Sequence, residues 1–334
     1  MITARDLEYH HSEKDDHTWT ETYFLPVAVP EAHLLVTVYI VVRPVLGIMS
    51  TDVVAYGSLT DTRSELLYID SHQHLPAPDR FSRIETVNGL SVIATDAPRD
   101  YRIDYVGYED TEIHVDWKGI MDPFDIHDPE HSPHATGDEH AQADGSGMGQ
   151  AYKGHFDLTG RVTGTVKIRG REFAVDRIDR MDHSWGPRDE RNFPYMNSIS
   201  AEFGEDLAYH LITKIDRDAP NGSDQSLAHG YVLTDGEVRG IVEMDLVTIR
   251  SGMIPVSMTM RLVDSVGEEH LLLGTADIGA PWDSYPANVT WMSLMRWQRG
   301  DRTAHGVVQE HHPLRLETAI SGRWWTDWPS HITT

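Results

Sequence analysis

The 334-residue sequence contains no cysteine and few basic residues. Without cysteine there is no disulfide, no thiolate metal ligand and no cysteine nucleophile, so any metal would have to be held by histidines and carboxylates. Lysine and arginine number 28 against 53 acidic residues, which gives a net charge of −25. Such an acidic chain repels phosphates, and we therefore expect no nucleic-acid partner.

Long apolar runs are also missing. The longest, residues 34–42, includes a threonine and a tyrosine and ends before an Arg-Pro pair, well short of the roughly 18 residues that a membrane span needs. It is typical of a buried strand, and we expect no membrane insertion. Residues 1–6 have no apolar signal region, so we expect a cytoplasmic protein.

Short segments with alternating side chains recur along the chain instead. Trp19, Glu21 and Tyr23 fall on one face of such a segment, and this period of two, with β-branched and aromatic residues, is typical of a strand. No long apolar period of 3.6 residues is present, so the pattern predicts an all-β protein of antiparallel hairpins. Further strands are predicted at residues 34–43, 49–57, 64–70, 81–87, 90–95, 101–108, 111–117, 154–159, 160–168, 172–178, 195–202, 207–215, 228–233, 237–246, 256–263, 270–274, 291–298 and 304–310.

Tight turns separate several of these strands. Asn88-Gly89 favours a type I′ hairpin turn, and Glu109-Asp110, Arg169-Gly170-Arg171 and Asp235-Gly236 are expected to form further turns.

The predicted strands fall into two groups. We expect an N-terminal β domain at residues 1–120, a loop or lid rich in Pro, Gly and His at residues 121–150, and a C-terminal β domain at residues 151–334. The spacing would suit two barrels or sandwiches packed side by side, with a ligand inside one or at their junction. The histidines of the loop do not have the spacing of a known metal site, so no specific metal is predicted there; they are His127, His131, His134 and His140, followed by His155.

Residues 179–189 read Asp-Arg-Met-Asp-His-Ser-Trp-Gly-Pro-Arg-Asp. This segment combines an imidazole, three carboxylates, two guanidinium groups and an indole, and an unpaired buried charge is costly. The segment is therefore interpreted as a strand end at the mouth of a cavity, with its polar side chains held by one another. Perturbed ionisable groups beside an apolar pocket are typical of acid–base chemistry.

Nucleophilic and cofactor chemistry fit the sequence less well. Ser184 follows His183 directly, without a Gly-x-Ser-x-Gly elbow, and neighbouring strand residues point to opposite faces. Gly145-Ser-Gly-Met-Gly follows a Pro-rich loop rather than a strand, so it lacks the context of a dinucleotide-binding motif. We expect no cofactor.

Proton transfer fits better, and Asp182, His183 and Glu21 are the candidate catalytic residues. In a continuous strand, Asp182 and Ser184 share one face while His183 and Trp185 share the other. The alternative is a structural knot in which an arginine bridges carboxylates between the two domains.

Two segments carry a resemblance to a known family. Residues 154–176, which begin Gly-His-Phe-Asp-Leu-Thr-Gly, and residues 180–189, Arg-Met-Asp-His-Ser-Trp-Gly-Pro-Arg-Asp, are similar to the carotenoid 1,2-hydratase (hydroxyneurosporene synthase) and tocopherol-cyclase-like group. Residues 18–24 and 305–310 resemble that group's first domain and closing strand. Met181 stands where relatives often carry arginine, and the segment 127–140 has no counterpart.

The resemblance implies a pair of lipocalin-like (calycin) β-barrel domains that handle hydrophobic isoprenoid or polyketide-derived molecules without a redox cofactor. Its reactions include hydration, dehydration and ring closure. The positions that match the group are Trp19, Glu21, His155, Asp182, His183, Trp185 and Arg188.

Together these observations predict a cofactor-independent acid–base enzyme acting on a terpenoid-like or polyketide-like substrate, as a hydratase or dehydratase (a lyase), an isomerase or a cyclase. One alternative is a non-catalytic carrier of an apolar molecule; another is a hydrolase with a metal bound by His and Asp. We expect a hydrophobic small molecule as partner and no bound metal, with a homodimer as one option for the oligomeric state. The residues expected to bind the substrate are Trp19, Tyr23, His155, Trp185 and Arg188.

Overall fold

The computed structural model describes residues 1–10, 15–130, 132, 135, 149–189, 193–219 and 224–321. Regular structure in these ranges is almost all β, which confirms the predicted fold class. Most of the histidines of the predicted loop, His131, His134 and His140, lie outside the described residues. Helical segments are short: η1 (Ala4–Leu7), η2 (Pro30–Ala32), η3 (Pro44–Leu46), η4 (Arg63–Glu65), η5 (Gly149–Tyr152) and α2 (Leu314–Ser321).

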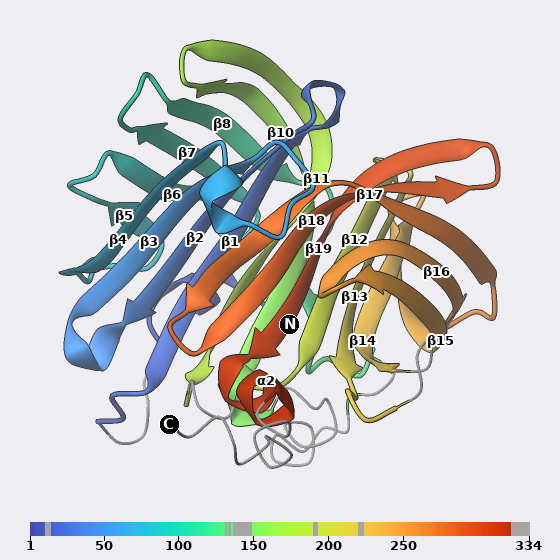
Figure 1. Ribbon diagram of the computed structural model, residues 1–334. Helices are drawn as coiled ribbons and strands as arrows, with labels where there is room; N and C mark the ends of the chain where they lie inside the picture. The colour runs from blue at the N-terminus through green and yellow to red at the C-terminus, as the bar shows by residue number, and fades with distance from the viewer. Residues whose placement is uncertain are drawn as a thin grey trace, which may run out of the picture.

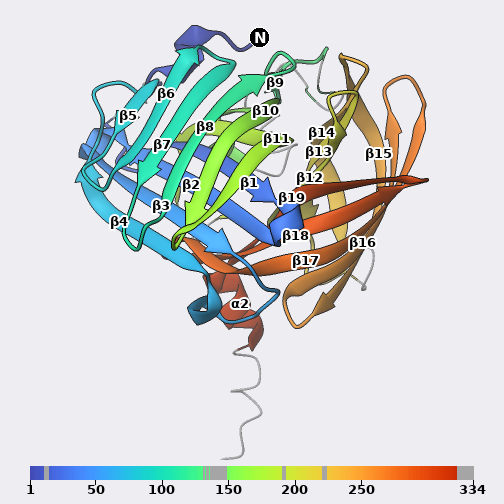
Figure 2. The same cartoon turned by 90° about the horizontal axis from the view of Figure 1, so that it is seen from above.

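The first sheet is antiparallel and strongly curled. Its strands run in the order β4-β3-β2-β1-β11-β10-β8-β7-β6-β5, with β9 beside β10. Figure 2 shows the curl, which places β6, β7 and β8 over β1, β2 and β3. The strands are β1 (Trp19–Val29), β2 (Leu34–Arg43), β3 (Ile48–Tyr56), β4 (Tyr68–Pro76), β5 (Arg83–Glu85), β6 (Leu90–Asp96), β7 (Asp100–Val106), β8 (Glu112–Gly119), β9 (Phe124–Asp125), β10 (Gly154–Ile168) and β11 (Arg171–Pro187).

The second sheet is a closed barrel in which each strand pairs with the next and β19 returns to β12. It lies beside the first sheet, with α2 at one end of the junction (Figure 1). Its strands are β12 (Met196–Gly204), β13 (Leu207–Ile215), β14 (Gln225–Thr234), β15 (Glu237–Ser251), β16 (Ile254–Asp264), β17 (Glu269–Tyr285), β18 (Asn288–Arg299) and β19 (Arg302–Pro313).

Strands β10 and β11 follow the predicted loop in sequence but complete the first sheet. β10 pairs with β8, and β11 pairs with β1 so that Tyr23 lies opposite His183. Because two long strands of the first sheet come from residues 154–187, we propose that the boundary between the two β units lies after Pro187 rather than near residue 150.

Hairpin turns follow the predicted positions with one difference. Arg169 and Gly170, with φ of 48° and 79°, are both left-handed, as a type I′ turn requires. At Asn88-Gly89 only Gly89 has positive φ, at 85°, and its N–H donates to the Thr86 carbonyl at 3.2 Å. The expected type I′ turn at Asn88-Gly89 is therefore wrong, because the chain makes a longer loop that needs glycine at its last position alone.

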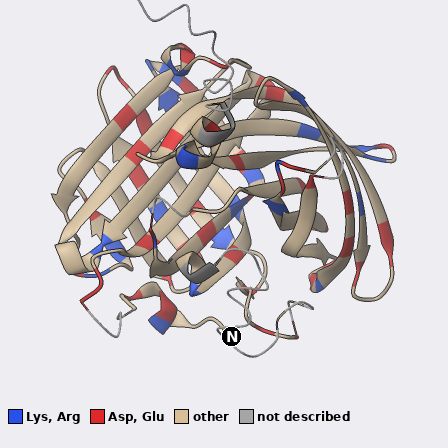
Figure 3. Ribbon diagram, turned by 60° about the horizontal axis from the view of Figure 1, so that its bottom comes forward, with Lys and Arg blue, Asp and Glu red and all other residues tan. Residues whose placement is uncertain are grey.

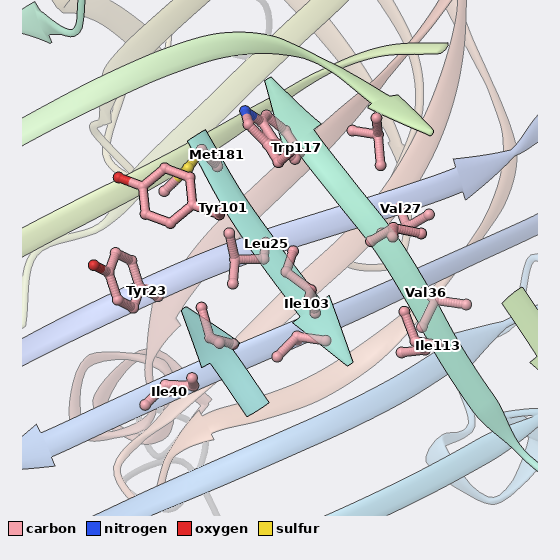
Figure 4. Packing of buried hydrophobic residues seen from close by; sticks show 14 of the residues in the cluster. Tyr23, Leu25, Val27, Val36, Ile40, Tyr101, Ile103, Ile113, Trp117 and Met181 are labelled. Carbon is pink, nitrogen blue, oxygen red and sulfur yellow. The ribbon is translucent and has the colours of Figure 1, made fainter. Parts of the chain in front are cut away.

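The interior of the first sheet is filled by alternate residues of its strands. Tyr23, Leu25 and Val27 of β1 point inward toward Tyr101 and Ile103 of β7 (Figure 4), and all five are buried. Burying such a side chain stabilises the fold by about 1.5–3 kcal/mol, which explains why the period of two is so regular here.

A separate apolar cluster joins the two sheets. Phe24, Tyr39 and Tyr56 from the outer face of the first sheet pack with Trp282 and Met292 of the barrel. Acidic residues are spread over strands of both sheets (Figure 3). No helix in the described part of the chain is long and apolar enough to span a membrane.

A substitution at the junction tests whether the contact between the two sheets stabilises the fold. Trp282 is 1% exposed, lies edge-on to Tyr39 at 4.9 Å between ring centroids, and donates Nε1–H to Asp52 at 3.2 Å. We expect Trp282→Ala to lower the free energy of unfolding by about 3–5 kcal/mol, measured by guanidinium titration. Leu273→Ala, an exposed site on the same strand, should change it by no more than about 0.5 kcal/mol. Equal effects of the two substitutions would contradict a core shared by both sheets.

Candidate functional site

Strand β11 carries the charged motif, and its side chains alternate between two surroundings. Met181 and Trp185 join the core inside the first sheet, and His183 lies beside Trp185 at 5.0 Å between ring centroids. Asp182 and Ser184 point the other way and line a cavity shared with the barrel. Successive side chains of β11 therefore point to opposite faces of the sheet, as the sequence predicted.

Two of the predicted catalytic residues, Glu21 and His183, lie together on the inner face and are fully buried. His183 Nε2 is 3.7 Å from Glu21 Oε2, and Nδ1–H donates to the Thr22 carbonyl at 2.9 Å. Burial lowers the pKa of His183 to about 3, which keeps the ring neutral. Asp182 lies on the opposite face of the sheet. The structure therefore does not place Glu21, Asp182 and His183 around one substrate.

The aromatic residues predicted to bind the substrate also lie on the inner face. Trp19 donates Nε1–H to Glu21 at 3.2 Å, Tyr23 stacks on Phe81 at 4.5 Å, and Trp185 packs against the same core. The cavity beside Asp182 contains none of these aromatic residues. Their role in binding stays a prediction.

A cavity of about 30 Å³ lies between β11 and the barrel. A water molecule needs roughly 10–15 Å³ of such space, so a larger ligand requires that side chains lining the cavity move. Polar and apolar groups from both sheets meet there: Thr22, Phe24, Tyr39, Tyr152, His155, Asp182, Ser184, Arg188, Met196, Ser198, Ile212, Gln309 and His311.

Arg188 brings a positive charge to this cavity. Its guanidinium is 3% exposed, donates to Tyr285 Oη at 2.5 Å and to Ser184 Oγ, and lies 4.8 Å from the ring centroid of Tyr152. Among the described residues, no carboxylate lies within ion-pair distance of it. A buried charge without a counter-charge is costly, so this position favours a ligand with an anionic or strongly polar oxygen.

A second arginine is fully compensated by carboxylates. Arg180 Nη1 donates to Asp157 Oδ1 and to Asp182 Oδ2, each at 2.7 Å. Asp157 Oδ1 also lies 3.1 Å from His155 Nε2 and 3.0 Å from His210 Nε2. Burial would raise the pKa of Asp157, but the neighbouring His210 and His155 hold it well below its usual range. Asp157 is therefore the anion at the centre of this network.

His155 connects the network to the cavity. It lines the cavity and is 3% exposed, and its Nδ1 has no hydrogen-bond partner among the described residues. Nε2 also lacks a well-aligned hydrogen bond but lies 3.1 Å from Asp157 Oδ1; the tautomer with the proton on Nε2 faces that carboxylate and leaves the lone pair on Nδ1. An imidazole oriented by a carboxylate is a common arrangement for moving protons.

Sequence reasoning found His155, Asp182 and Arg188 but missed Asp157 and Arg180. The alternation of strand side chains could have identified both. Asp157 lies two residues after His155 and Arg180 two residues before Asp182, so each shares a face with a predicted site residue. His210 and Tyr285 were also missed. They come from barrel strands whose position against the first sheet no local pattern reveals.

A larger pocket of about 300 Å³ adjoins the cavity. Tyr39 and Tyr285 line both, and Tyr39 Oη donates to Tyr285 Oη at 2.9 Å. Asp52 and Arg43 lie among the other lining residues of this pocket. A volume of this size is typical of a small-molecule pocket, and the tyrosine pair separates it from the buried cavity.

Two more carboxyl groups are buried elsewhere in the junction. Arg177 Nε lies 3.3 Å from Asp179 Oδ2, while its Nη2 is 4.0 Å from Glu202. Burial and the neighbouring Asp179 raise the pKa of Glu202 to about 8.

A curled antiparallel sheet packed against a closed barrel is the architecture of lipocalin-like two-domain proteins. Residues 3–314 match the family described as "Domain of unknown function (DUF7064)", and the chain belongs to that family. None of the curated proteins matches the sequence significantly.

Solved structures share the fold at low identity. A protein assigned as an AttH from Nitrosomonas europaea is 13% identical with a TM-score of 0.54, over 87% of this chain and 91% of its own. Kievitone hydratase from Nectria haematococca is 10% identical with a TM-score of 0.51, over 87% of each chain. CghA with Sch210972 is 9% identical with a TM-score of 0.53, over 89% of this chain and 88% of its own.

At these identities the likeness establishes the fold and not the reaction. The predicted lipocalin-like architecture is confirmed, whereas the specific relation to carotenoid hydratases stays a prediction.

The buried carboxyl of Glu202 predicts a pH effect on stability. Its folded pKa of about 8 exceeds the ordinary value of 4.5, so between these values the folded state holds a proton that the unfolded state releases. The free energy of unfolding contributed by this group therefore falls as pH rises toward 8. We expect Glu202→Gln to gain stability relative to the wild type between pH 5 and pH 9, measured by thermal melts across pH. A stability difference that does not change with pH would contradict the shifted pKa.

Proposed function

We propose that the protein is a cofactor-independent acid–base enzyme that acts on an apolar small molecule in the cavity between the two sheets. The observation that carries the proposal is the meeting of His155, Asp182 and Arg188 in one buried cavity with aromatic walls. The class of reaction is hydration or dehydration, isomerisation or ring closure, because these need proton transfer and charge stabilisation but no redox group.

Arg188 would bind the oxygen of the substrate. A carbonyl, enolate or carboxylate oxygen supplies the negative charge that the described protein residues around Arg188 lack, and the hydroxyl groups of Ser184 and Tyr285 hold the guanidinium in place. In the low dielectric between the sheets this contact would strengthen as negative charge develops on that oxygen.

His155 would transfer the proton. Its Nδ1 would take a proton from carbon or from water, and Asp157 would stabilise the resulting imidazolium through the 3.1 Å contact at Nε2. Asp182, paired with Arg180, lies on the same face of the neighbouring strand and would provide a second acceptor. In a hydration, His155 would take a proton from the attacking water while Arg188 holds the enolate oxygen that forms, and the imidazolium would then give that proton to carbon; a dehydration runs these steps in reverse.

The larger pocket would hold the rest of the substrate, with Tyr39, Val41 and Met49 as its apolar contacts. It adjoins the cavity at Tyr39 and Tyr285, so a molecule lying in it reaches Arg188 once these two rings part. The solved structures with this fold include a kievitone hydratase and CghA with Sch210972, which supports a reaction of the hydratase or cyclase type. A terpenoid-like or polyketide-like skeleton is the proposed substrate class.

The test compares the same substitution at two positions of β11. The protein is incubated with a panel of terpenols, alkenes and polyketide-derived enones, and products are measured by mass spectrometry. Asp182→Asn and His155→Gln should each lower kcat by about 10²- to 10⁴-fold. Asp176→Asn, at an exposed residue on the same strand whose side chain is 59% exposed, should leave it unchanged.

The carrier alternative predicts a different outcome. If native mass spectrometry shows an apolar compound bound and returned unaltered, and no compound of the panel is converted, the protein is a binding protein and the proposed catalysis is wrong. If compounds are converted but Asp182→Asn and His155→Gln retain full turnover, the reaction takes place elsewhere in the molecule.

A further inference from the structure

Three side chains with metal-ligating atoms converge on the inner face of the first sheet, away from the cavity. They are His10 from the segment before β1, Glu21 from β1 and His183 from β11. His10 Nδ1 is 3.2 Å and His183 Nε2 is 3.7 Å from Glu21 Oε2, and one ligating atom from each residue lies within 4.8 Å of the others.

The cluster leaves a buried nitrogen without a partner. His183 is fully buried, and because Nδ1–H donates to the Thr22 carbonyl, Nε2 carries the lone pair. That lone pair faces the carboxylate oxygen of Glu21, and no described residue donates a hydrogen bond to Nε2. Two acceptors directed at each other repel. Glu21 Oε2 accepts a hydrogen bond from His10 Nδ1, and an ion in place of that proton would also remove the repulsion between Oε2 and His183 Nε2.

Glu21 lacks a permanent cation. It is fully buried, and its ion-pair partners among the described residues are His10 and His183, with no lysine or arginine. Oε1 accepts the backbone N–H of His10 at 2.7 Å and Nε1–H of Trp19 at 3.2 Å, which leaves Oε2 directed at the two imidazoles. A buried carboxylate needs a counter-charge.

We propose that His10, Glu21 and His183 form a binding site for a divalent transition-metal ion. Ligands bonded tetrahedrally to one zinc ion at about 2.0–2.1 Å lie roughly 3.3 Å apart, close to the two separations at Glu21 Oε2. Two imidazoles and one carboxylate suit zinc and also iron(II), with further positions open for water.

Contacts outside these ligands resemble those of known metal sites. Ligating histidines usually donate their second ring nitrogen to a carbonyl or carboxylate. His183 does so to Thr22, and His10 Nε2 lies 3.6 Å from Asp6 Oδ1. The His10 ring is also stacked on Trp185 at 3.8 Å between centroids. The ion would therefore attach the N-terminal segment to the first sheet.

This inference departs from the expectation that no metal is bound, and it does not rest on the proposed function. It assigns Glu21 and His183, which were predicted to be catalytic, to metal binding. Metal affinity and turnover are separate readouts, so one proposal can fail without the other.

The test measures metal binding by the full-length chain without a histidine tag. After dialysis against a chelator, Zn²⁺ and Fe²⁺ (anaerobically) are titrated by calorimetry, and Co²⁺ by its visible absorption. We expect one ion per chain, a higher melting temperature with metal, and an affinity that falls by at least about 100-fold in Glu21→Gln and His183→Gln. Metal analysis of the chain as purified, before dialysis, identifies the ion, because sites of this kind bind Zn²⁺ more tightly than Fe²⁺ in general.

Two further sets of variants distinguish loss of a metal ligand from unfolding and from binding elsewhere in the chain. His10→Gln alters a partly exposed ligand and should lose the metal while the circular dichroism spectrum is unchanged, which separates ligation from folding. His229→Gln and His270→Gln belong to the other described clusters that could hold an ion, and should keep full affinity. Absence of stoichiometric binding, or loss of the metal in His229→Gln or His270→Gln but not in His10→Gln, would overturn the proposal.

Discussion

The structure depends on charged side chains buried between its two sheets. Arg180 and Asp157 are at most 3% exposed, and removing water from such ions costs several kcal/mol each unless they are paired with good geometry. Asp182 and the histidines around Asp157 provide that pairing. The apolar cluster around Trp282 packs between the two sheets, so the position of β10 and β11 against the barrel has to keep Arg180 and Asp157 paired.

The pairing of buried charges also distinguishes the two arginines of the junction. Arg180 meets two carboxylates at 2.7 Å, whereas the described partners of Arg188 are neutral hydroxyl and carbonyl oxygens. Both lie in the junction, and only Arg188 has positive charge available for a ligand. His155 lines that cavity and contacts Asp157, so the carboxylate that pairs with Arg180 is also the one beside the proposed proton-transfer group.

The sequence predicted features that depend on residues close together in the chain. Alternation along β1 and β11 predicted the strands and placed Asp182 and His183 on opposite faces, and the residue types around them indicated a buried polar site. Which face meets the barrel depends on contacts between strands far apart in the chain, such as β10 with β13 and β14. For that reason Asp157 with His210, and Arg188 with Tyr285, could not be paired from sequence. The inner cluster was missed because His10 precedes any regular strand.

The motif on β11 thus contributes residues to both proposed sites, one on each face of the sheet. The central claim is that the substrate binds between the sheets, on the Arg188 side. A crystal structure with a compound that the protein converts or retains tests it most directly. We predict a ligand oxygen within hydrogen-bonding distance of the Arg188 guanidinium and the carbon skeleton beyond Tyr39 and Tyr285. A ligand inside the first sheet beside Tyr23, or inside the closed barrel, would contradict the account.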